Sequence, residues 1–367
     1  MQHFFTEIKT LPRAVWVLFF VRLILSAGAF VNPFMTLVLK EHVRLNDATV
    51  GLVLSFSAIA GALGLVLGGK LGDMFKKPVL LSIFQLGTGM VFIVCGLIGF
   101  HPVLAGLLLL SVLLMSSSWP ILNSLVADIT PVPSQKLAFS LLYWGNNVGF
   151  SIGPLAAGFL FNSAPRMLFF GNAVVLLVAG FLVLRIRDMS VAAHAAPNAS
   201  LSGRSVFSLL KERPLILLFG LSALAGAFIY SQHTFSVPLL LNERFGGAAG
   251  PKLFGMLMSL NGLTVVVCTL PITALSRKWP TLISVAVSTL IYGIGFGLYG
   301  IAISVFSTAL LTFIWTLGEI IGATNTNVFV AEKSPPEYRS RMNSFISLCY
   351  TAGNFLEIGR ASCRERV

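Results

Sequence analysis

Charged residues are scarce in this chain of 367 residues, since aspartate, glutamate, lysine and arginine together make up 10% of it. An ordinary soluble domain contains roughly a quarter of such residues. Hydrophobic residues account for 56% of the chain instead, and the mean hydropathy is +0.88. This composition excludes an ordinary water-soluble protein and indicates a chain that lies mostly within a lipid bilayer.

Cysteine is also rare, with four in the chain. Cys95, Cys268 and Cys349 lie inside apolar stretches, where a thiol behaves as a small hydrophobic group. Their spacing predicts neither a disulfide framework nor a metal site. No glycine-rich nucleotide loop or nucleophile with a plausible base is apparent, so we expect a protein that is not an enzyme and binds no cofactor. Residues 1–12 lack the apolar core of a cleavable signal peptide.

Long apolar stretches make up most of the chain. About 20 apolar residues suffice for a helix that crosses the hydrocarbon core, and we count about eleven such spans. They are residues 14–39, 48–71, 79–99, 103–128, 137–161, 166–186, 214–241, 251–276, 281–299, 302–331 and 340 onward. The pattern predicts an all-α integral membrane protein with a six-helix bundle at 1–186, a cytoplasmic linker at 187–213 and a second bundle at 214–356.

The basic residues predict an orientation. The formal net charge is +12, which by itself would suggest a nucleic-acid partner. Placing the N-terminus in the cytoplasm puts most lysines and arginines of the connecting segments on the cytoplasmic side, as the positive-inside rule requires. We therefore expect no nucleic-acid binding and a multi-pass protein of the bacterial inner membrane.

The final segment, Glu357–Val367, differs from what precedes it. It reads EIGRASCRERV and interrupts the apolar run that begins at Phe345. The string resembles the translation of a common sequencing adapter, a kind of scar that is excluded from fold reasoning. On this interpretation the native sequence ends near Leu356, the second bundle is truncated in helix 11, and helix 12 is missing. The alternative is a genuine cytoplasmic tail.

The two groups of spans contain similar strings. Residues 27–30 read Ala-Gly-Ala-Phe and so do residues 225–228, 198 positions later, and a proline and an acidic residue follow each string. Several matches at a similar offset indicate an internal duplication. Repeats of this kind place a cavity at the interface of the two halves, near the bilayer midplane, and rocking of one half against the other gives alternating access.

A glycine-containing segment lies between the second and third spans. It runs Gly69-Lys-Leu-Gly-Asp73-Met-Phe-Lys-Lys77. Glycine allows close approach of helix ends, aspartate can pair with a neighbouring helix end, and lysine holds the loop inside; a plain turn with stop-transfer charges is the alternative. The segment resembles the signature loop of the major facilitator superfamily. Met74 and Lys76 replace the usual basic residue and second glycine, so the resemblance implies a cytoplasmic gate with an incomplete charge network.

The fifth span carries a second motif. Glycines recur at Gly145, Gly149 and Gly153, followed by Pro154 and Gly158, which makes a groove for a close neighbouring helix and a site for a bend. Ordinary helix packing is the alternative. The motif closely resembles that of the drug:proton antiporters of the same superfamily. The resemblance implies the major facilitator fold, with two six-helix bundles related by a pseudo-twofold axis, and a hinge formed by these glycines.

Three ionisable residues lie inside spans and are candidates for proton coupling. Glu319 lies deep in the tenth span, where loss of water favours its neutral form. Arg22 lies in the first span, and His233, in the seventh, titrates near neutral pH. The alternatives are a hydrogen-bonded structural carboxyl, snorkelling of Arg22 to the interface and a simple hydrogen-bond donor. The fourth span lacks the arginine that many drug:proton antiporters contain.

Polar and aromatic residues at mid-span depth are candidates for the substrate cavity. They are Asn32, Phe34, Gln85, Trp119, Asn123, Asn147, Tyr230, Gln232, Asn261, Trp315 and Asn325. Each alone also fits a role in helix–helix hydrogen bonding. Few fixed charges favour neutral or amphipathic solutes.

We expect a proton-coupled transporter of small molecules, a monomer in the lipid bilayer, most similar to multidrug efflux antiporters. It would be driven by the proton gradient. The alternatives are a proton-coupled importer or facilitator of a small metabolite, and more remotely a non-transporting membrane sensor or a membrane enzyme.

Overall fold

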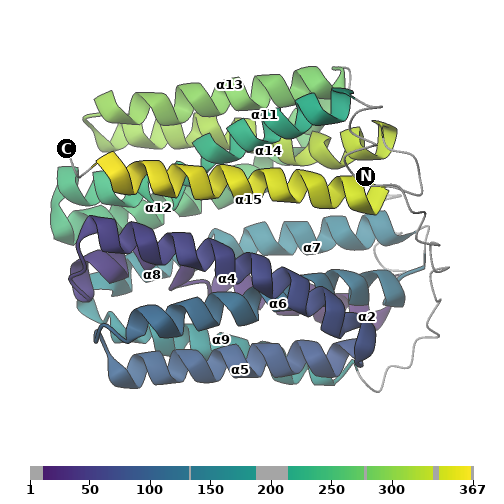
Figure 1. The fold of residues 1–367 in the computed structure, drawn as a ribbon, viewed down its shortest axis with the longest axis horizontal. Coiled ribbons are helices and arrows are strands. Elements are labelled where there is room, and N and C mark those ends of the chain that lie inside the picture. The colour runs from purple at the N-terminus through teal and green to yellow at the C-terminus, as the bar shows by residue number, and fades with distance from the viewer. Residues whose placement is uncertain (1–10, 132–133, 187–213, 277–278, 334–338, 365–367) are drawn as a thin grey trace.

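A computed structural model describes residues 11–131, 134–186, 214–276, 279–333 and 339–364. Within these ranges the chain forms helices and turns and no strand. Eight helices in the described ranges are long and apolar enough to cross a membrane. The proposed linker at 187–213 lies outside these ranges. Figure 1 shows the helices running roughly side by side along the long axis of the molecule.

The first half contains the helices that correspond to spans one to six. They are α2 (Arg13–Ala27), η1 (Asn32–Phe34), α3 (Met35–Leu37), η2 (Val38–His42), α4 (Asp47–Met74), α5 (Lys77–Ile98), α6 (Leu104–Ile129), α7 (Gln135–Phe150), α8 (Gly153–Ser163) and α9 (Arg166–Leu184). The fifth span is thus two helices, α7 and α8. The break lies directly before Pro154, which occupies the first turn of α8, where its missing N–H costs nothing.

The second half contains the remaining spans. They are α11 (Pro214–Tyr230), η4 (Ser231–His233), α12 (Ser236–Ser276), α13 (Thr281–Gly297), η5 (Leu298–Ile301), α14 (Val305–Lys333) and α15 (Arg339–Arg364). The element α12 contains the end of span seven and the whole of span eight, with a kink of the backbone at Gly246 between them. Gly246 has φ 81°, a conformation that residues with a Cβ rarely adopt.

The first spans of the two halves are interrupted in corresponding places. The 3₁₀ turn η1 begins at residue 32 and η4 at residue 231, an offset of 199 that matches the repeat in the sequence. Thr36, just after the first break, donates a hydrogen bond of 2.7 Å to the carbonyl oxygen of Thr234, just after the second. The duplicated segments therefore contact each other across the junction of the two halves.

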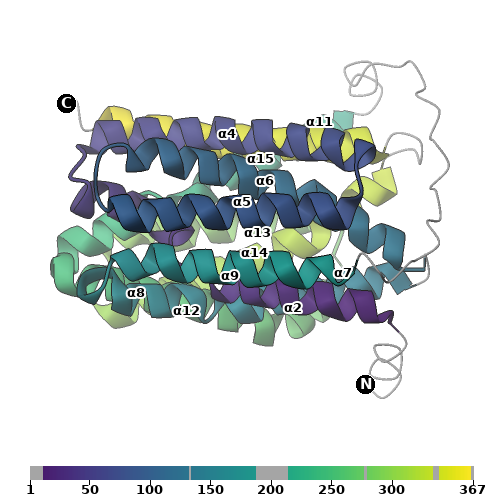
Figure 2. The same cartoon turned by 90° about the horizontal axis from the view of Figure 1, so that it is seen from below.

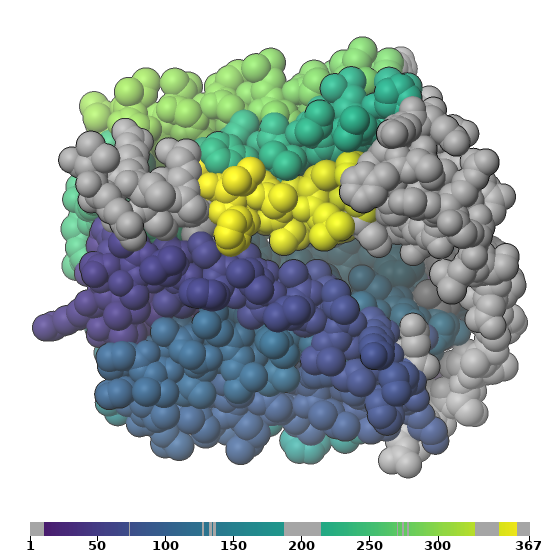
Figure 3. All heavy atoms as spheres, in the orientation of Figure 1, coloured from purple at the N-terminus to yellow at the C-terminus, as the bar shows by residue number. Residues whose placement is uncertain are grey.

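Neighbouring helices of different halves contact along two lines. Within the first half α4 packs on α6, α5 on α9 and α2 on α7, and within the second α13 packs on α14 and α11 on α15. Between the halves α8 packs on α12 and α4 on α15. Figures 1 and 2 show α4 and α15 side by side, and the surface in Figure 3 shows α15 between α11 and α4.

The buried core joins the halves at one end of the bundle. We call the end at which α9 finishes and α11 begins the linker end, and the opposite end, with His42 and Gly246, the distal end. The largest cluster of buried side chains contains residues of both halves; among them are Phe34, Val38, Phe161, Phe169, Leu241, Phe254 and Trp315. Two smaller clusters lie nearer the linker end, and among the described residues each belongs to one half. The halves are therefore closed against each other at the distal end.

The last helix does not stop where the sequence suggested. The polar string after Leu356 was expected to interrupt the apolar span, but α15 continues to Arg364. Glu357 is fully buried, and Ser236 donates a hydrogen bond of 3.4 Å to its Oε1. Helical propensity explains the continuation, since arginine, alanine and glutamate all favour helices. The origin of this string and the absence of a helix 12 stay expectations.

A candidate transport site between the halves

Glu319 lies at the centre of a polar group in the second half. Asn261 of α12 donates a hydrogen bond of 2.7 Å to its carboxyl Oε2, and the side chain of Tyr230, at the end of α11, is a second hydrogen-bond partner. Asn261 also donates to the hydroxyl oxygen of Thr316 at 3.0 Å. Three helices far apart in the sequence thus converge on one carboxyl group. Within the described residues no cation lies within ion-pair distance of it.

Small residues next to Glu319 fix the orientation of α14. A methyl group added at Gly318 would lie 3.0 Å from the backbone oxygen of Ser288, and the Ser288 hydroxyl donates a hydrogen bond of 2.7 Å to the Gly318 carbonyl oxygen. One face of α14 is therefore held tightly on α13. Glu319, the next residue, points toward α12 and α11 instead.

Aromatic rings surround this polar group. The ring of Tyr230 lies 5.3 Å from that of Tyr292 and 5.8 Å from that of Trp315, measured between centroids. Tyr143 of the first half lies close enough to Glu319 for an electrostatic interaction. The carboxyl group is therefore in the second half but within reach of the first, as a coupling residue needs to be.

His233 is anchored in the break between α11 and α12. Its Nδ1–H donates a hydrogen bond of 2.6 Å to the carbonyl oxygen of Tyr230, and its ring lies 4.3 Å from the Tyr230 ring and 6.2 Å from that of Trp315. The bond ties the imidazole ring to the end of α11, directly before η4. This geometry fits the simple hydrogen-bond donor better than a proton carrier.

Arg22 lies on the other side of the junction, in the first half. Its guanidinium carbon is 3.6 Å from the centre of the Trp119 ring on α6. One turn further along α2, Ser26 donates a hydrogen bond of 2.8 Å to Oδ1 of Asn146 on α7. The polar groups of this half therefore lie on α2, α6 and α7. We found no arginine in the fourth span, but Arg22 places a guanidinium against that span all the same.

The glycines of the fifth span make close contacts on two sides. A methyl group at Gly149 or Gly153 would collide with the backbone of α2 near Ser26. A methyl group at Gly158 would collide with the backbone of α12 at Pro251, and Gly255 of α12 approaches Pro154 equally closely. The motif thus holds α7 to its own half and α8 to the opposite half, with the break between them.

The loop after α4 is only partly as expected. Lys77 pairs with Asp128, at the end of α6, at an Nζ–Oδ2 distance of 2.5 Å. The side chain of Asp73 lies outside the described residues. Gly69 is not a point of close approach, since a methyl group there would meet open space among the described residues. The preceding Gly68 contacts the backbone of Ser117 instead, because it lies on the face of α4 that meets α6.

That contact had a signal in the sequence which we did not use. Gly64 and Gly68 are four residues apart, the spacing of small-xxx-small packing, and both meet the backbone of α6. Which glycine makes the close helix contact depends on the helix face on which it lies, and not on its match to the consensus of the loop.

The remaining cavity candidates are scattered. Phe34, Gln85, Asn147 and Asn325 are buried, at 0%, 2%, 7% and 9% exposure. Phe34 belongs to the core that closes the distal end, and its ring lies 5.1 Å from that of Phe254 in the other half. These four residues line no open space in this conformation. Residues at least partly exposed are Asn32, Trp119, Asn123, Tyr230 and Gln232.

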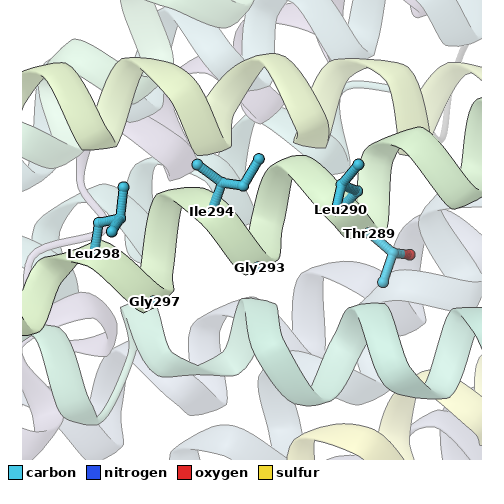
Figure 4. Close-up of a pocket in the computed structure, with 6 residues that line it drawn as sticks. All are labelled: Thr289, Leu290, Gly293, Ile294, Gly297 and Leu298. Atoms are coloured by element: carbon cyan, nitrogen blue, oxygen red, sulfur yellow. The ribbon is translucent and has the colours of Figure 1, made fainter.

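An apolar groove on α13 is separate from the site. It is lined by Thr289, Leu290, Gly293, Ile294, Gly297 and Leu298, which follow one another along this helix (Figure 4). The face of α13 that packs on α14 carries other residues, such as Ser288 and Gly295. We therefore do not assign the substrate to the groove.

Hydrogen bonds that join the halves were missed by sequence reasoning. Asn242 donates a hydrogen bond of 2.7 Å to Oε1 of Glu41, and Asn162 donates one of 2.7 Å to the carbonyl oxygen of Gly247. Both lie at the distal end. The repeat was a signal for the first bond, whose residues are 201 positions apart, but not for the second, whose residues are 85 apart.

The described chain consists of two helical halves, each with an interrupted first span, and a polar site lies at their junction. These features are typical of all-helical membrane transporters. The family model of the Major Facilitator Superfamily matches residues 16–356. The chain belongs to the major facilitator superfamily. This confirms the fold class that the motifs predicted.

Relatives of known sequence cover most of the chain. It is 24% identical over 307 residues to the uncharacterized MFS-type transporter YqjV of Bacillus subtilis, covering 83% of this chain and 74% of the relative. It is 23% identical over 356 residues to a Na(+), Li(+), K(+)/H(+) antiporter of Planococcus maritimus, covering 89% and 83%. It is 31% identical over 200 residues to the multidrug resistance protein MdtG of Klebsiella pneumoniae, covering 52% and 47%.

Solved structures share the fold. A bacterial homologue of the lysosomal transporter Spinster, in an inward-facing and occupied conformation, has a TM-score of 0.69 at 17% identity and covers 94% of this chain and 79% of that one. A peptide transporter POT in complex with sulfate has a TM-score of 0.78 at 15% identity and covers 95% and 88%.

Proposed function

We propose that this protein exports small amphipathic molecules from bacteria in exchange for protons. The observation that carries the proposal is Glu319, a carboxyl group in the tenth span that neutral donors, not a cation, hold at the junction of the halves. The antiporter motif in the fifth span and the relative named a multidrug resistance protein support the direction of transport. The relative named a cation/proton antiporter supports proton exchange.

Glu319 would be the group that carries the proton. A carboxyl group away from water is stable when neutral, and it becomes charged when water or a cationic partner reaches it. Its hydrogen bonds come from an amide and a hydroxyl, which satisfy either protonation state. Asn261 and Tyr230 would hold the carboxyl in place.

Exposure of the site would alternate by rocking of the halves about α7 and α8. We place the distal end outside the cell and the linker end inside. In this conformation the outer side is closed by the core around Phe34 and by the hydrogen bonds Thr36–Thr234 and Asn242–Glu41. Opening outward requires these contacts to break, and the gate near Asp73 and Lys77 would then close the cytoplasmic side.

The test is drug export from an efflux-deficient bacterial host that expresses the protein. We expect export of an amphipathic fluorescent dye that stops when a protonophore collapses the proton gradient. Glu319→Gln, which cannot lose a proton, would abolish it, whereas Glu243→Gln, the same change at an exposed position of α12, would leave it intact. Export that is indifferent to the protonophore or to Glu319→Gln would refute the coupling. Proton-dependent uptake of a metabolite would favour the importer instead.

A further inference from the structure

Arg22 lies inside the first apolar span and has no anionic partner among the described residues. It lies nine residues after the start of α2, or about 13 Å along the helix at 1.5 Å per residue. Among the described residues, no carboxylate lies within ion-pair distance of its guanidinium, and it makes no hydrogen bond to the protein. Other basic side chains do have acceptors: Lys77 pairs with Asp128, and Arg244 donates to carbonyl oxygens.

Trp119 contacts the guanidinium of Arg22 but accepts no hydrogen bond from its N–H groups. The guanidinium carbon lies over the ring, 3.6 Å from its centre, which is a cation–π contact. The N–H donors of a guanidinium lie in its plane and point away from a stacked ring. A charge away from water with unused donors is costly, so these N–H groups can bind an acceptor that none of the described residues supplies.

We propose that Arg22 and Trp119 form a binding site for the anionic group, a carboxylate or sulfonate, of an organic solute with an aromatic or aliphatic body. Guanidinium binds such groups through two parallel hydrogen bonds. Ser26, one turn beyond Arg22 on α2, donates to Oδ1 of Asn146 on α7, and the Asn146 amide nitrogen is itself a hydrogen-bond donor. This deepens the proposed function, on which it rests, because it names the substrate class, and it replaces the expectation of neutral solutes.

The same geometry separates the roles of the two charged residues. Arginine stays protonated at any physiological pH, so Arg22 cannot take up and release the proton. Glu319, in the other half, can. Arg22 therefore selects the charge of the solute, and Glu319 couples its movement to protons.

The experiment is a thermal-shift titration of the purified full chain with three probes that share one hydrophobic body: naphthalene-2-carboxylate, its carboxamide and naphthylmethylamine. A ligand that binds the folded state raises the melting temperature according to its concentration relative to Kd. We expect the carboxylate to bind at least ten times more tightly than the amide. Arg22→Gln would abolish this preference, and Arg22→Lys, which keeps the charge but not the fork, would weaken it.

The matched control is Arg244→Gln, which removes an arginine that binds only backbone carbonyls and should keep the preference for the carboxylate. Equal binding of the three probes by the unaltered protein, or a preference that survives Arg22→Gln, would overturn the proposal. So would protection by inorganic sulfate without protection by the carboxylate. Glu319→Gln should retain the preference, so a failure of proton coupling and a failure of this inference give different results.

Discussion

Gly158→Ala tests whether α8 and α12 separate when the outer side opens. An added methyl carbon would lie 2.9 Å from the backbone oxygen of Pro251, 3.2 Å from the Cα of Gly255 and 3.3 Å from the Cα of Lys252. All three are backbone atoms, so none can rotate away. An ordinary contact of about 3.4 Å requires the helices to move apart by about 0.5 Å, and overpacking of this kind costs about 1–3 kcal/mol.

That cost applies only to the conformation in which the distal end is closed. Gly158→Ala should therefore shift the equilibrium toward the open conformation by about 5- to 150-fold, the ratio that corresponds to 1–3 kcal/mol. The assay is the rate at which a membrane-impermeant maleimide labels a cysteine placed at Phe34, which is fully buried in the closed conformation, in a background without other cysteines.

The control is Gly293→Ala on α13, where an added methyl carbon meets open space among the described residues. It should label at the rate of the unaltered protein. If Gly158→Ala folds and labels no faster than Gly293→Ala, the close contact of α8 and α12 does not limit opening, and the reasoning is wrong.

Three further outcomes follow from single contacts. Asn242→Ala removes the hydrogen bond to Glu41 and should speed labelling at the distal end several-fold; an unchanged rate would exclude this contact from the outer closure. Arg244→Gln removes hydrogen bonds to carbonyls of η5, worth about 1.5–3 kcal/mol each for a charged donor, and should lower the melting temperature by several degrees. Lys77→Gln and Asp128→Asn should each lower transport by a similar factor, because both break the same ion pair. The double variant should lose little more, and additive losses would contradict a role for this ion pair in transport.

Much of this molecule could be predicted from local patterns. The ends of the spans lie within a few residues of helix ends, although spans one, five and seven are interrupted inside, because a long apolar segment in lipid must satisfy its own backbone as a helix. The repeat predicted matching halves, and the breaks at η1 and η4 correspond to it. Glu319 was evident as a charge within an apolar segment, and the spacing of the fifth-span glycines predicted close helix contacts that the backbone does make.

Other features depended on which helix faces meet. The contact of Gly68 rather than Gly69, the burial of Phe34 and the stacking of Arg22 on Trp119 all join segments distant in the sequence. In a soluble protein the apolar side of a helix identifies its buried face. In a membrane, lipid-facing and protein-facing sides are both apolar, so composition does not distinguish them. The sequence alone determined that these helices form and roughly where they end, while only the tertiary structure decided which faces meet, because that choice rests on shape and on a few polar contacts.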